Sequence, residues 1–143
     1  MPVFAGQSRE QMRRAYLEAW NKFTAHAPLE PLDAQLATVI TDHPEYIPLI
    51  ESGEEALTAD FTPESGRVNP FLHMAMHLAI REQVATDRPP GIARIYRKLT
   101  QRLRDTHEVE HMMLVPLAEL MWEAQQSGRT PDEQEYLERL RAL

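Results

Sequence analysis

The stretch Asn69-Pro-Phe-Leu-His-Met-Ala-Met-His-Leu-Ala-Ile80 carries a strong helix signal in the middle of the 143-residue chain. Asn69 can accept hydrogen bonds from the first free backbone amides of a helix, and Pro70 suits the first helical position. Apart from the two histidines, the residues that follow are all apolar. A helix that is apolar on nearly every side is buried. His73 and His77 therefore need hydrogen bonds, a metal ion or a cavity.

Helix start and stop signals also stand before this stretch. Ser8-Arg-Glu-Gln11 is a capping-box pattern that predicts a first helix. Asp33 is the expected cap of a second helix, which should end before Pro44. A third, shorter helix is expected in Glu45–Leu57, and the stretch Asp60–Val68 reads as a loop.

Three more helices are expected after a turn at Thr86–Gly91. The first is amphipathic, with a cationic face opposite its apolar stripe; that face consists of Arg94, Arg97, Lys98 and Arg102. The second begins at Asp105 or Thr106 and is closed by Gly128. The third opens at the capping box Thr130-Pro-Asp-Glu133. Its expected inward residues are Tyr136, Leu137, Leu140 and Leu143.

The whole pattern predicts an all-α fold. No stretch alternates with a period of two, so we expect about six helices in a bundle or an orthogonal array. A chain of 143 residues suits a single domain covering residues 1–143. The chain holds no run of about 18 apolar residues that could span a membrane. Its first ten residues lack the basic start and apolar core of a signal peptide, so we expect a cytoplasmic protein.

Two histidine pairs are the main functional signal. His73 and His77 form the first pair, and the stretch Asp105-Thr-His-Glu-Val-Glu-His-Met-Met113 contains the second, His107 and His111. Four positions apart on a helix, two imidazoles share one face and can bind one metal ion. Because the chain has no cysteine, His, Asp and Glu are its only strong ligands.

We therefore predict that the four histidines converge on one divalent metal ion, with zinc and iron as the candidates. Glu108 and Glu110 flank the second pair. Either could act as an extra ligand, offset the charge of the ion, or hold an imidazole tautomer. At 100° per residue, His107 and His111 share a face with Leu114, Ala118 and Met121, and we expect this face to point into the core. His26 and His43 read as ordinary residues at helix ends.

Other interpretations of the same residues stay open. His107-Glu-Val-Glu-His111 fits the H-E-x-x-H pattern of zinc peptidases, in which the glutamate activates water. Glu108-Val-Glu-His111 fits the Glu-x-x-His element of carboxylate-bridged di-iron bundles, although no second copy is present. The histidines can equally form a structural, hydrogen-bonded layer in a non-catalytic interaction module. The sequence does not say whether the protein is an enzyme.

Charge is unevenly distributed along the chain. The net charge of −7 argues against general nucleic-acid binding. Between Phe23 and Gly66 there are nine Asp or Glu and no Lys or Arg, whereas Arg81 to Arg104 holds seven basic residues against two acidic ones. We expect the two segments to pair in the fold or across a homodimer, or the basic segment to meet an acidic protein partner.

Several long motifs resemble one family. These are the run from Asn69 to Gln83, the turn Asp87-Arg-Pro-Pro-Gly-Ile92, the stretch from Asp105 to Met113, and Trp122-Glu-Ala-Gln125. Together they closely resemble a bacterial family known as domain of unknown function 1841. The resemblance covers essentially the whole chain and implies a single bacterial domain. The family brings no established activity, cofactor or functional residue with it.

Overall fold

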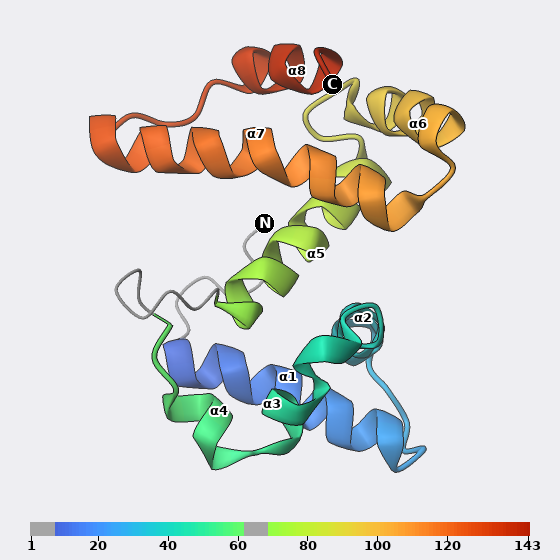
Figure 1. The fold of residues 1–143 in the computed structure, drawn as a ribbon, viewed down its shortest axis with the longest axis vertical. Coiled ribbons are helices and arrows are strands. Elements are labelled where there is room, and N and C mark those ends of the chain that lie inside the picture. The colour runs from blue at the N-terminus through green and yellow to red at the C-terminus, as the bar shows by residue number, and fades with distance from the viewer. Residues whose placement is uncertain (1–7, 62–68) are drawn as a thin grey trace. The chain divides into compact units, whose positions relative to one another are not determined.

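The computed structural model describes residues 8–61 and 69–143. As predicted, this part is all-α: it contains eight α-helices and one short 3-10 helix, and no strand (Figure 1). The sequence predicted about six helices. The difference lies mainly in Glu45–Leu57, where Pro48 and Gly53 break the predicted third helix into short pieces. Most of the predicted loop Asp60–Val68 lies outside the described residues.

The described chain forms two compact units, which divide between Ala75 and Met76 inside helix α5 (Pro70–Thr86). The single-domain organisation stays a prediction. Among the helices of the described residues, none combines the length and the apolar character that crossing a membrane requires.

The first unit is built around α1. Besides the first turns of α5, its elements are α1 (Arg9–Thr24), α2 (Pro31–Thr41), the 3-10 helix η1 (Pro44–Tyr46), α3 (Ile47–Glu51) and α4 (Glu54–Thr58). Helices α2, α3 and α4 all pack against α1. The buried apolar side chains include Tyr16, Leu17, Trp20, Leu36, Val39, Ile40, Ile50 and Leu57.

Hydrogen bonds at the helix starts explain where α1 and α2 begin. The predicted capping box is confirmed, because Ser8 Oγ accepts from the amide of Gln11 and the Gln11 side chain accepts from the amide of Ser8. The prediction that Asp33 caps the second helix is wrong. Pro31 takes the first helical position, so α2 starts earlier, and the Asp33 carboxylate accepts from the amide of Glu30 at 3.0 Å.

A buried arginine connects α1 with the chain around the end of α4. Arg13 is 2% exposed, and its Nη1 donates to the carbonyls of Ala56 at 2.9 Å and Ala59 at 2.8 Å. Carbonyls at a helix end lack partners within the helix. The guanidinium therefore satisfies otherwise unpaired acceptors while its own donors are satisfied in the interior.

The second unit holds the rest of α5 with α6 (Ile92–Leu103), α7 (Thr106–Ser127) and α8 (Glu133–Arg141). Helices α6, α7 and α8 pack on one another. Their shared core consists of Ile80, Ile92, Ile95, Leu99, Val109, Met113, Leu114, Leu120, Tyr136, Leu137 and Leu140. The burial predicted for Tyr136, Leu137 and Leu140 is therefore confirmed.

The ends of α7 and α8 follow local rules. Asp105 caps α7 by accepting from the amides of His107 and Glu108. Gly128 ends α7 with φ of 71°, a left-handed conformation that glycine adopts without strain. For α8 the cap is Asp132 rather than the predicted Thr130, because the Asp132 carboxylate is the acceptor that reaches the first amides of the helix.

The prediction for the inward face of α7 is wrong for most of its residues, although Leu114 is buried as expected. The helix buries Val109, Met113, Pro116 and Leu120, whereas Met121 is 44% exposed. The reason is that α7 carries apolar residues on all sides, so the period of its hydrophobic pattern does not choose one face. The histidine face lies next to the core instead of in its centre, and His107 and His111 are both partly exposed.

Two methionines of α7 test this assignment of faces. We expect Met113→Ala to lower the free energy of unfolding by about 2–5 kcal/mol, because the side chain is fully buried and its loss leaves a cavity. Met121→Ala is the matched control and should change it by less than about 0.5 kcal/mol. Urea denaturation of both variants measures the difference, and equal losses would contradict the assignment.

Candidate metal centre

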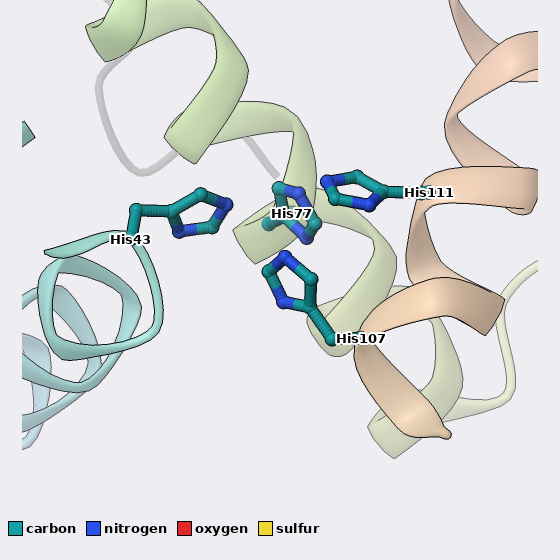
Figure 2. A group of neighbouring side chains, drawn as sticks. All are labelled: His43, His77, His107 and His111. Carbon is teal, nitrogen blue, oxygen red and sulfur yellow. The ribbon is translucent and has the colours of Figure 1, made fainter. Parts of the chain in front are cut away.

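Three histidines of the second unit come together from two helices. His77 lies in α5, and His107 and His111 lie in the first two turns of α7. Figure 2 shows the rings of the two α7 residues projecting toward the ring of His77. The cap at Asp105 fixes the start of α7, and the spacing of four residues then places both α7 imidazoles on one side of the helix.

The three imidazoles lie within reach of a common point. The ring centroids are 4.3 Å apart for His107 and His111, 4.8 Å for His77 and His111, and 5.1 Å for His77 and His107. One ring nitrogen from each residue can be chosen so that all lie within 4.8 Å of one another. Nitrogen ligands about 2.0–2.1 Å from a zinc ion are separated by about 3.3 Å in a tetrahedral site. Small side-chain movements would bring the ring nitrogens from separations of up to 4.8 Å to the separation of a tetrahedral site.

Glu110 and Arg81 hold the ring of His77. The Nδ1 atom of His77 lies 2.7 Å from Glu110 Oε1, and both groups are buried. Arg81 donates to the same carboxylate through Nε at 2.9 Å and through Nη2 at 3.1 Å. When Nδ1 carries the proton and donates to the carboxylate, the lone pair of the ring is on Nε2.

The electrostatics of the cluster keep Glu110 ionised. Burial raises the pKa of Glu110, but the hydrogen bonds from His77 and Arg81 and the charge of Arg81 together hold that pKa below its usual value. A carboxylate that stays charged is the stronger acceptor for an imidazole N–H.

His111 is shifted toward its neutral form. Burial lowers the pKa of His111, and the neighbouring His107 and His77 lower it further, against the opposite effect of Glu108 and Glu110. A neutral imidazole is the form that binds a metal ion. The cluster therefore favours the ligand form of His111 near neutral pH.

His73 belongs to the first unit and has other neighbours there. Its ring centroid lies 5.2 Å from that of His43, in an edge-to-face arrangement, and 6.2 Å from that of Tyr46. His43, which Figure 2 also draws, is buried in this unit. Its Nδ1 lies 2.8 Å from the carbonyl oxygen of Val39, and its ring stacks on Tyr46. The interpretation of His43 as an ordinary helix-end residue missed this burial.

The two predicted carboxylates have different positions. Glu110 is 6% exposed and is bound to His77 and Arg81, which is the tautomer-holding geometry among the roles considered for it. Glu108 is exposed in the first turn of α7, where its charge acts on His111.

Arg81 is the residue of this cluster that sequence reasoning did not single out. A usable signal was present, because Arg81 stands four residues after His77 and therefore shares its helix face. A cation on the same face as a buried histidine pair indicates a carboxylate partner nearby.

Chemically, the three imidazoles with this carboxylate and guanidinium behind them could hold a divalent metal ion.

Comparisons with known proteins give one finding. The model of a family described as "Domain of unknown function (DUF1841)" matches residues 8–142. No curated protein matches, and no solved structure matches.

Removing the shared carboxylate tests the cluster without any ligand. Glu110→Ala should lower the free energy of unfolding by about 1–3 kcal/mol, because it leaves donors of His77 and Arg81 without their acceptor. The control is Glu82→Ala, an exposed glutamate on α5, for which we expect a change below about 0.5 kcal/mol. Chemical denaturation at neutral pH compares the two, and equal stability would argue against the cluster.

Proposed function

The chain belongs to the DUF1841 family, whose description names no activity, and we propose from its own residues that it binds a divalent transition-metal ion. The proposed ligands are His77, His107 and His111. Zinc and iron are the preferred ions, because imidazole suits both and the chain offers no thiolate.

The contact between Glu110 and His77 is the observation that carries this proposal. Histidines that bind metals almost always donate their other ring N–H to a carboxylate, a carbonyl or a water molecule, which fixes the tautomer and makes the ligand nitrogen more basic. The 2.7 Å contact from Nδ1 of His77 to Glu110 has this geometry.

Charge balance also supports the proposal. Three neutral imidazoles bring no negative charge to a divalent ion, and the nearest buried anion is Glu110, which Arg81 already partly neutralises. The ion would therefore keep much of its positive charge, so that it could bind an anionic ligand or polarise a bound molecule.

A single ion fits these residues better than a carboxylate-bridged pair. In di-iron bundles, glutamate oxygens bind the ions themselves. Here Oε1 of Glu110 contacts His77 and Arg81, and Oε2 also accepts from Arg81. Both oxygens are thus committed to positioning His77.

Metal content is the direct test. We expect untagged protein, saturated with zinc or iron(II) and then desalted, to retain about one ion per chain by elemental analysis. The double variant His77→Ala, His111→Ala should retain none. His26→Asn is the matched control: it removes an exposed histidine, and asparagine tolerates the positive φ of 57° at this position.

Melting temperatures measured with and without a chelator give a second test of metal binding. Because an ion that binds only the native state stabilises it, a chelator should lower the melting temperature of the loaded wild-type protein and leave that of the double variant unchanged. Wild-type protein that retains no metal and melts at the same temperature with and without chelator would contradict the proposal and favour the structural histidine layer.

The role of Glu110 has its own test. Glu110→Gln keeps the size of the side chain but removes its charge, so we expect about a 10–100-fold loss of metal affinity with all three histidines intact. Competition with a chromophoric chelator measures this affinity. Glu82→Gln, at an exposed position of α5, is the control and should bind as the wild type does. An unchanged affinity in Glu110→Gln would rule out the positioning role.

A further inference from the structure

We propose that the basic face of α6 docks on the acidic surface of the first unit of a second copy of this chain. The basic face is defined here as Arg94, Arg97, Lys98 and Arg104, and the acidic surface as Glu45, Glu54 and Glu55. This inference does not depend on the metal site.

The basic face is exposed and contiguous. Arg94, Arg97 and Lys98 fall within about 100° of one another around α6, on the side opposite the buried Ile92 and Leu99. Arg104 continues this surface directly after the helix. An α-helix rises about 1.5 Å per residue, so the four cations are spread along α6 and just beyond its last residue.

These cations are not neutralised by the described part of the chain. None of the four takes part in an ion pair or a side-chain hydrogen bond within residues 8–61 and 69–143. Two other arginines of the second unit do form ion pairs: Arg81 binds Glu110, and Arg139 binds Glu123 and Glu135. An unpaired run of like charges repels itself and attracts an anionic partner.

The first unit offers the complementary surface. Glu45 lies in η1, and Glu54 and Glu55 begin α4. All three are exposed, and no ion pair involves them among the described residues. They belong to a stretch of sequence, from Phe23 to Gly66, that holds nine acidic residues and no Lys or Arg.

A second copy fits this chemistry better than a nucleic acid does. A net charge of −7 disfavours approach to a polyanion. The second unit itself carries exposed carboxylates on α8, including Glu133, Glu135 and Glu138. In a two-fold dimer, by contrast, the contact between basic face and acidic surface occurs twice, so that each basic face meets an acidic surface.

A charge exchange tests the proposal. One variant, Arg97→Glu with Lys98→Glu, reverses the basic face; the other, Glu54→Lys with Glu55→Lys, reverses the acidic surface. By sedimentation velocity at low salt, the wild type should form dimers, and each variant alone should dimerise at least about tenfold more weakly. Their equimolar mixture should regain dimers, because both contacts in the mixed pair join opposite charges.

Folding controls and the effect of salt accompany the charge exchange. Circular dichroism and thermal melting confirm that the variants are folded, and about 0.5 M salt should weaken the wild-type dimer by screening. A wild type that stays monomeric at all concentrations overturns the proposal. So does a mixture that fails to associate when both variants are folded. Saturable binding of a short DNA duplex by a monomeric wild type would assign the basic face to nucleic acid instead.

Discussion

The carboxylate of Glu110 is the constraint on which the histidine cluster depends. It is buried, so its charge needs partners, and His77 and Arg81 supply them from the neighbouring helix. This contact fixes the register of α5 against α7. It also decides which nitrogen of His77 faces away from the carboxylate. A single buried anion thus connects the packing of two helices with the ligand chemistry of the cluster.

Charged side chains at the surface of the second unit differ in whether they form ion pairs. Glu123 of α7 and Glu135 of α8 pair with Arg139, whereas Arg94, Arg97 and Lys98 of α6 form no ion pair among the described residues. An exposed run of unpaired cations is available to an anionic partner, which is the role we propose for this face. The ion and the partner we propose therefore use different surfaces and can be tested separately.

Local rules predicted most of the fold and part of the cluster. Helices with clear caps, such as the one at Ser8, were predicted from neighbouring residues alone, and the pair His107 and His111 followed from helical spacing. What failed depended on the path of the chain. The burial of His43 arises from the turn after α2, which no periodic pattern encodes. The face of α7 that enters the core could not be chosen because apolar residues surround that helix.

The connection between α6 and α7 has a consequence for both proposals. Only Arg104 and Asp105 separate the two helices: Arg104 ends α6 at φ of 58°, and Asp105 caps the turn that carries His107. So short a linker gives the helices little independent freedom. A partner that docks on α6 would therefore lie near the first turn of α7, where His107 is placed to bind an ion.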